Sequence, residues 1–264
     1  MGRAGSVRPP AVAGSFYPAD PARLADAVDA LLPPPAADQA APEAVIAPHA
    51  GYEYSGPVAG AALSLLGPAR ETLRRVVLIG PAHYVPLRGL AVTGVEAFET
   101  PFGLLDVDDD ARAAALALPQ VQLDDAPHAP EHSLEVELPI LQRLLGRFSV
   151  VPLVTGRAGT AEVADVLDAV WGGPETVVVC SSDLSHYHDH DTATALDQRT
   201  AAAIVARDVE AVAPRDACGS VAVRGLLEVA RRRDLAVRLL ELRTSHDAGG
   251  PPDRVVGYGA FALG

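Results

Sequence analysis

The chain has 264 residues, of which 49% are hydrophobic and 21% charged, a composition typical of a folded globular protein large enough for one large domain or two small ones. Its formal net charge of −13 argues against a nucleic-acid partner, because binding to a phosphate backbone requires a surplus of basic side chains. All 21 basic residues are arginine, so Schiff-base chemistry at lysine and a lysine-dependent phosphate loop are excluded for this chain.

The sequence predicts neither a membrane span nor a secretory leader. No segment reaches the roughly 18 continuous apolar residues of a spanning helix. The N-terminal stretch MGRAGSVRPPAVAGSFYP lacks the apolar core of a signal peptide. We therefore expect a cytoplasmic protein with no membrane partner. Cys180 and Cys218 are too few for a disulfide framework, so each is expected to be a core thiol, a metal ligand or a nucleophile.

In the first half of the chain, predicted helices alternate with predicted strands. Asp20 followed by Pro21 is a typical helix start, with aspartate as the cap and proline at the first helical position. The run VVLI is β-branched, apolar and bounded by glycine, which favours a buried strand. The other elements expected here are a loop over 33–42, strands at 45–47, 75–79 and 90–93, and helices at 55–67 and 111–118.

The second half repeats this alternation. Leucines at helical spacing predict a helix over 134–145, with Pro139 in its first turn or at a kink. Alternating strands and helices predict one α/β domain spanning residues 1–264, with a mostly parallel or mixed central sheet flanked by helices. The remaining expected elements are a loop over 119–131, strands at 149–154, 176–180, 236–242 and 255–262, and helices at 160–171, at 191–206 and from residue 218 onward.

Three predicted strands are followed directly by polar side chains. One leads to His49, a second to His83 through a Gly-Pro break, and a third to Asp183 and His186. If these strands are parallel, the side chains emerge at one edge of the sheet, where α/β proteins place their ligands. Histidines that converge beside a carboxylate suit a divalent metal, and this spacing favours Asp183 as the anionic ligand.

The other histidines are assigned from their local surroundings. His132 begins a helix with a buried face and is expected to lean into the crevice, whereas His128 lies in a Pro-rich loop and is interpreted as incidental. His188 and His190, in the run HYHDHD, are interpreted as surface residues. His246 lies in SHDAGG, which is typical of a flexible loop that could close over a site.

Two alternatives remain open from the residues alone. Asp183 could cap the turn that follows it instead of binding a metal. Tyr52 and Tyr54, which follow His49 closely, could either line a pocket or pack against the core.

Several longer motifs occur together in one order. VAGSFYP, APHAGYEYSGPVA, GPAHYVP, ETPFGLLDVD, EHSLEVELPILQ, SSDLSHY, ACGSVAV and VVGYGAFAL extend from Val7 to Leu263. In this order they resemble the Memo family, the B proteins of the AmmeMemoRadiSam system. The resemblance implies a fold similar to that of the LigB-type class III extradiol dioxygenases, with an iron or copper site and zinc as a further candidate.

The same resemblance implies a set of site residues. It implies that the metal ligands are His49, His83 and Cys218, in place of the aspartate that spacing alone favours. A helix start after Cys218 is expected to lower the thiol pKa, and a thiolate favours iron, copper or zinc over magnesium. The residues expected around the metal are His132, Asp183 and His186 in catalytic roles and Tyr52 and Tyr54 in substrate binding.

Three functions follow from these expectations. The first is an iron- or copper-dependent oxidoreductase acting on a small molecule. The second is a metal-binding partner of the radical SAM and AMMECR-type proteins of the same system, without turnover. The third is metal-assisted hydrolysis, in which zinc and a nearby carboxylate activate water.

Overall fold

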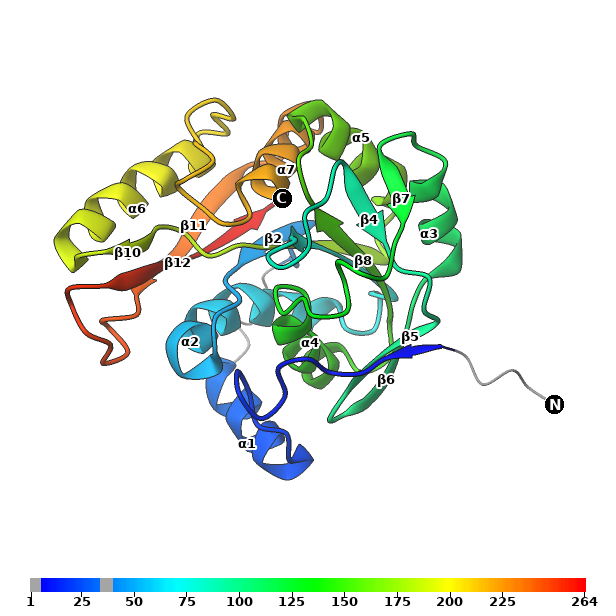
Figure 1. Cartoon of the computed structure of the whole chain (residues 1–264), viewed down its shortest axis with the longest axis horizontal. Helices are drawn as coiled ribbons and strands as arrows, with labels where there is room; N and C mark the ends of the chain where they lie inside the picture. The colour runs from blue at the N-terminus through cyan, green and yellow to red at the C-terminus, as the bar shows by residue number, and fades with distance from the viewer. Residues whose placement is uncertain (1–5, 34–39) are drawn as a thin grey trace.

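A mixed nine-stranded sheet runs through the middle of the computed structural model, which describes residues 6–33 and 40–264 (Figure 1). Most of the loop expected over 33–42 lies outside the described residues. The strands are β2 (Ala44–Ala47), β3 (Arg75–Pro81), β4 (Leu90–Val92), β7 (Val121–Leu123), β8 (Ser149–Thr155), β9 (Thr176–Ser181), β10 (His186–His188), β11 (Val237–Thr244) and β12 (Val255–Leu263).

The centre of this sheet is parallel and its margins are antiparallel. The strand order is β10-β12-β2-β9-β3-β8-β4-β7, and β11 pairs with β12. The strands β2, β9, β3 and β8 run parallel to one another, whereas β12 is antiparallel to β2 and β4 is antiparallel to β8. The central strands are apolar over most of their length, because a parallel sheet is covered on both faces. The predicted α/β fold with a mixed sheet is confirmed.

Helices cover both faces of the sheet and form two cores (Figure 1). Side chains alternate along each strand, so Val77 and Ile79 belong to one core while Val76 and Leu78 belong to the other. Among the described residues, no helix is both long enough and apolar enough to cross a membrane. The first core includes α3 (Asp109–Leu116), α5 (Thr160–Val170), α6 (His190–Val205) and α7 (Ser220–Arg232), and the second includes α1 (Pro21–Leu31), α2 (Tyr52–Leu63) and α4 (Leu138–Leu145).

Short elements depart most from the sequence-based expectations. A small second sheet and two 3-10 helices were not predicted, and β7 lies inside the loop expected over 119–131, because segments this short carry no readable periodicity. The helix expected from Ser55 begins at Tyr52, whose backbone N–H donates to the carbonyl of Phe16. Pro139 lies in the first turn of α4, as predicted. The small sheet consists of β1 (Val7–Arg8), β5 (Ala97–Thr100) and β6 (Gly103–Asp106), and the 3-10 helices are η1 (Ser64–Ala69) and η2 (Glu135–Glu137).

Cys180 is a core thiol, as the sequence predicts, because it lies in β9 and is 0% exposed. We expect Cys180→Ala to cost about 1 kcal/mol of stability, since a small cavity replaces the sulfur. In a domain of this size that cost lowers Tm by about 2–4 °C. Thermal unfolding measured beside metal content checks this, and a variant that loses metal at unchanged Tm would contradict it.

Candidate metal centre

Three adjacent parallel strands each deliver a polar side chain two residues past their ends. His49 follows β2, His83 follows β3, and Asp183 follows β9, which lies between those two strands. The backbone N–H of His49 donates to Asp183 Oδ1 at 2.8 Å, and the ring centroids of His49 and His83 are 5.3 Å apart. The prediction that these residues share one edge of the sheet is confirmed.

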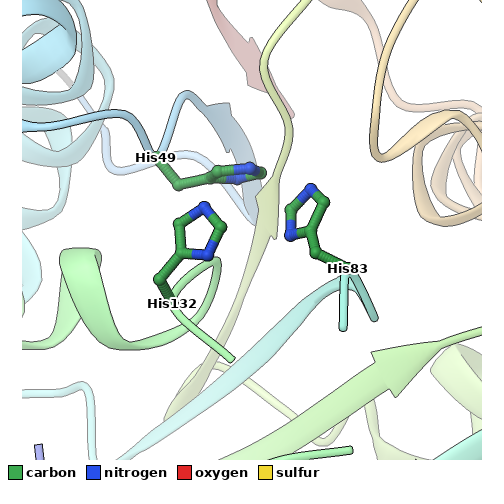
Figure 2. A group of neighbouring side chains, drawn as sticks. All are labelled: His49, His83 and His132. Atoms are coloured by element: carbon green, nitrogen blue, oxygen red, sulfur yellow. The ribbon is translucent and has the colours of Figure 1, made fainter. Parts of the chain in front are cut away.

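His132 completes a group of three histidines at this edge. His49, His83 and His132 each offer a ring nitrogen within 4.8 Å of the others, and Figure 2 shows the three rings directed toward one space. The His132 ring lies 5.4 Å from that of His49 and stacks on that of His83 at 4.8 Å, measured between centroids. Within the described part of the chain, these residues form the one such group of three or more histidine, cysteine or acidic side chains.

The carboxylate of Glu131 holds two of these histidines in place. It accepts hydrogen bonds from the His83 backbone N–H at 2.6 Å and His83 Nδ1 at 2.8 Å, and from the backbone N–H groups of His132 and Ser133 at 3.0 and 2.9 Å. Burial alone would raise the pKa of Glu131, but these hydrogen bonds lower it to about 2. An ionised carboxylate only accepts, so His83 Nδ1 carries the proton of this hydrogen bond, and Nε2 is the nitrogen of this ring directed away from Glu131.

A serine fixes the proton on His49 in the same way. The hydroxyl of Ser181 donates to the carbonyl of Ser133 at 2.6 Å and contacts His49 Nδ1 at 2.7 Å. The single hydroxyl hydrogen is used by the carbonyl, so Nδ1 of His49 must donate to Ser181. The lone pair of His49 therefore lies on Nε2, the ring nitrogen that is 3.4 Å from Cys218 Sγ.

Burial favours the neutral form of two histidines of this group, His49 and His132. Burial lowers the pKa of His49 well below its usual value, and the neighbouring rings of His132 and His83 lower it further. Burial also lowers the pKa of His132, whose Nδ1 lies 3.2 Å from the hydroxyl of Tyr84. Neutral imidazoles that share a crevice are electron-pair donors, so this group can hold a metal ion.

Cys218 lies beside this group without joining it. Its Sγ is 3.4 Å from His49 Nε2 and accepts from the backbone N–H of Asp183 at 3.3 Å. The backbone after Cys218 passes close to β9: a Cβ on Gly219 would lie 2.7 Å from the carbonyl oxygen of Ser181, so this position requires glycine. The expected lowering of the thiol pKa is wrong, because burial and the charge of Asp183 raise it. Whether Cys218 or Asp183 is a metal ligand remains a prediction.

Asp183 and His186 border the crevice on the β9 side. Asp183 is 4% exposed, and burial raises the pKa of its carboxyl, against the hydrogen bond from His49 and the nearby charge of His186. The Nδ1 of His186 donates to the carbonyl of Leu184 at 2.8 Å, which leaves its Nε2 free. The two side chains expected from the sequence to act as acid and base therefore lie close to the three histidines.

The two tyrosines after His49 differ in their surroundings. The hydroxyl of Tyr52 donates to the carbonyl of Val136 at 2.9 Å, and its ring lies 5.6 Å from that of Tyr17. These contacts favour the packing alternative for Tyr52. Tyr54 is 39% exposed, so a substrate contact remains a prediction for Tyr54.

The remaining histidines divide into a buried one and three near the surface. His128 lies in a turn, as expected, but it is 2% exposed and its Nε2 donates to the carbonyl of Ala91; that it is incidental to the site stays a prediction. Burial lowers the pKa of His128 to about 4, which keeps it neutral. His188 is exposed as predicted, whereas His190 is half-buried beside His246.

Sequence reasoning missed a set of buried charges that positions the His132 turn. Glu135 accepts from the guanidinium of Arg8 at 2.7 Å and from the hydroxyl of Tyr17 at 2.6 Å. The same guanidinium donates to the carbonyl of Glu131 at 2.6 Å. The signal was available in EHSLEVE, where acidic residues interrupt an apolar segment, but such residues usually face solvent on a helix.

Comparison with known proteins identifies the family. A family model described as Memo-like protein matches residues 8–262. The chain belongs to the Memo family. Its curated relatives include MEMO1 family proteins from Ignicoccus hospitalis, 37% identical over 96% of this chain and 97% of the relative, and from Methanopyrus kandleri, 34% identical over 97% and 98%.

One solved structure is similar to this Memo-family chain in fold. It is the crystal structure of an uncharacterised Escherichia coli protein, with a TM-score of 0.50 and 16% sequence identity. The match covers 76% of this chain and 92% of the other. At this identity the likeness shows the fold alone.

The role of Glu131 is testable by removing its charge. Glu131→Gln leaves His83 and His132 without a carboxylate acceptor, so we expect metal affinity to fall about 10- to 100-fold. Competition with a chromophoric chelator under anaerobic conditions measures the change. Glu53→Gln, an exposed substitution on α2, is the matched control, and equal affinities of the two variants would contradict the assignment.

A second buried carboxyl, Glu137, predicts a pH dependence of stability. Neither of its oxygens has a hydrogen-bond partner among the described residues, and burial raises its pKa well above the usual value, so it keeps its proton to a higher pH in the folded chain than in the unfolded chain. In the unfolded chain, the carboxyl of Glu137 ionises above about pH 4.3. The free energy of unfolding therefore falls as the pH rises above this value, by about 1.4 kcal/mol per pH unit, until the pH reaches the folded-state pKa of Glu137.

The Glu137→Gln variant has no ionisable carboxyl at this position, so its free energy of unfolding should not show this fall with pH. The difference in unfolding free energy between the variant and the parent chain should grow in favour of the variant from pH 5 to pH 8. Denaturant unfolding at each pH measures this difference. Parallel profiles would mean that Glu137 is ionised in the folded state and has a partner.

Proposed function

We propose that this Memo-family protein is an iron- or copper-dependent oxidoreductase that acts on a small molecule. The observation that carries the proposal is the set of three imidazoles, His49, His83 and His132, whose ring nitrogens converge. Imidazole ligands suit iron and copper, with zinc as the third candidate. Three protein ligands leave coordination positions open for a substrate or an oxidant.

The surroundings of the group fit such an ion. In His49 and His83 the Nδ1 atom is hydrogen-bonded to Ser181 and Glu131, so Nε2 is the nitrogen of each ring that is oriented to bind an ion. When bound, iron or copper would supply the electron-transfer chemistry that these side chains lack. Cys218, 3.4 Å from His49 Nε2, is the candidate for a further ligand.

The remaining residues of the crevice would bind substrate and move protons. The side chain of His83 is 27% exposed and Tyr84 is 56% exposed, which gives a small molecule access from solvent on that side. His186 and Asp183 would give or take a proton at His186 Nε2 and the Asp183 carboxyl. Tyr54 would contact the body of the substrate.

Two other activities remain as proposals. Metal-assisted hydrolysis is favoured by the carboxyl of Asp183 beside a donor set that also suits zinc. A role as a metal-binding partner of radical SAM and AMMECR-type proteins is carried over from the family resemblance. The proposed compartment is the cytoplasm, where the free thiols of Cys180 and Cys218 would stay reduced.

Metal analysis after anaerobic purification, followed by oxygen uptake with a panel of phenolic substrates, tests the proposal. We expect about one iron or copper per chain, and loss of most of it in His49→Ala, His83→Ala and His132→Ala, because two imidazoles hold the ion more weakly than three. His188→Ala, which removes an exposed histidine, should keep full metal content.

The same measurement separates the candidate ligands and functions. Metal loss in Cys218→Ser but not in Asp183→Asn would make the thiol a ligand, and the reverse would favour the carboxylate. Zinc with oxygen-independent turnover would favour the hydrolase. The proposed function would be contradicted if the purified parent chain contained no metal and the histidine variants had the same metal content as the parent.

A further inference from the structure

The fourth parallel strand, β8, also delivers a polar side chain to the carboxyl edge of the sheet. Arg157 lies two residues past the end of β8, the same spacing at which β2, β3 and β9 place the residues of the candidate metal centre. A β-bridge pairs Arg157 with Arg88, which lies two residues before β4. Because paired backbones lie about 4.8 Å apart, the two arginine side chains begin next to each other.

The backbones that carry these two arginines are held together by hydrogen bonds. The N–H of Gly89 donates to the carbonyl of Arg157, and the N–H of Arg157 donates to the carbonyl of Leu87, each at 2.9 Å. The close approach depends on glycine, because a Cβ on Gly156 would collide with the carbonyl oxygen of Leu87. The positions from which the two side chains extend are therefore fixed before any ligand binds.

Arg88 and Arg157 line one cavity, and their positive charges are not matched by acidic partners. The cavity has a volume of about 460 Å³, which is enough for a small molecule. Within residues 6–33 and 40–264, neither guanidinium has a hydrogen-bond or ion-pair partner. The one carboxylate of the lining belongs to Glu162, and it accepts from the backbone N–H of Gly159 at 2.6 Å. One negative charge therefore faces two positive charges, and the cavity carries a net positive charge.

The chemistry of this pair suits a doubly charged anion. Two neighbouring guanidinium groups repel each other, and an anion between them replaces that repulsion with attraction. Guanidinium groups bind phosphate and carboxylate through paired hydrogen bonds, and a phosphate group carries up to two negative charges at neutral pH, one for each arginine.

We propose that Arg88 and Arg157 bind a phosphate group, free or carried by a small molecule, at the carboxyl end of β8. The carboxyl edge of the sheet is where α/β proteins bind their ligands. The formal net charge of −13 repels anions from the molecule as a whole, so binding depends on these two side chains. The site uses none of the residues of the candidate metal centre and does not depend on the proposed function.

Calorimetric titration of the full-length chain with inorganic phosphate and with phenyl phosphate tests the proposal. The chain is first treated with a chelator, so that no ion at the candidate metal centre can bind the anion. We expect saturable binding of about one phosphate group per chain and a rise in Tm when the anion is added. Arg88→Gln/Arg157→Gln should weaken binding at least about tenfold and abolish the rise in Tm, because charge-assisted hydrogen bonds are lost.

The matched control is Arg199→Gln/Arg215→Gln, which removes two exposed arginines outside the cavity and should bind as the parent chain does. Tighter binding of phenyl phosphate would assign the site to a phosphate ester, and tighter binding of inorganic phosphate to the free ion. The proposal would be overturned by absence of saturable binding, by unchanged affinity in Arg88→Gln/Arg157→Gln, or by an equal loss in the control. Because metal is removed beforehand, failure of the proposed oxidoreductase function would not affect this result.

Discussion

The parallel pairing of β2, β9 and β3 is the constraint on which the rest of the site depends. Three adjacent strands in the same direction must end at one edge, and each places a polar residue two positions past its end. Pairing of Ala47 with Ser181 and of Ile79 with Cys180 sets the register, which brings His49, His83 and Asp183 together. Burial of both faces of the sheet makes a shift of this register costly.

Burial and hydrogen bonding then determine which protonation states are favoured at that edge. Low-dielectric surroundings keep His49 and His132 neutral, whereas four N–H donors keep Glu131 ionised. The ion pair between Arg8 and Glu135 ties the N-terminal segment to the turn that carries His132. A buried ion pair adds little net stability, so we interpret this one as fixing the position of the turn.

Much of the fold could be predicted because its central strands and longer helices carry strong patterns. The run VVLI and the leucines of α4 were readable, and the Gly-Pro break after β3 correctly placed His83 beside His49 at the edge of the sheet. The short strands β2 and β4 were predicted, but β1, β5, β6, β7 and β10 were not, since so few residues show no clear alternation. Placement of His132 in the crevice was foreseen, but its convergence with His49 and His83 depends on Glu131 and Arg8, whose burial no local pattern reveals.

In the candidate site, too, local sequence patterns predict some residues, whereas the properties of others depend on contacts with residues distant in sequence. His49, His83 and Asp183 follow from strand ends, a local feature. The thiol pKa of Cys218 was mispredicted, because the expected effect of a helix start is outweighed by burial and by Asp183, which is distant in sequence. Tyr52 was ambiguous because a hydroxyl near a ligand residue can also bond to a backbone carbonyl, as it does here with Val136.

The most direct test of the central claim is anomalous X-ray diffraction at the iron or copper absorption edge, from crystals loaded with metal without oxygen. The account predicts one strong peak at this sheet edge, within bonding distance of Nε2 of His49 and His83 and of a ring nitrogen of His132. A peak that lacks a histidine of this group, or that lies elsewhere while this edge stays empty, would contradict it.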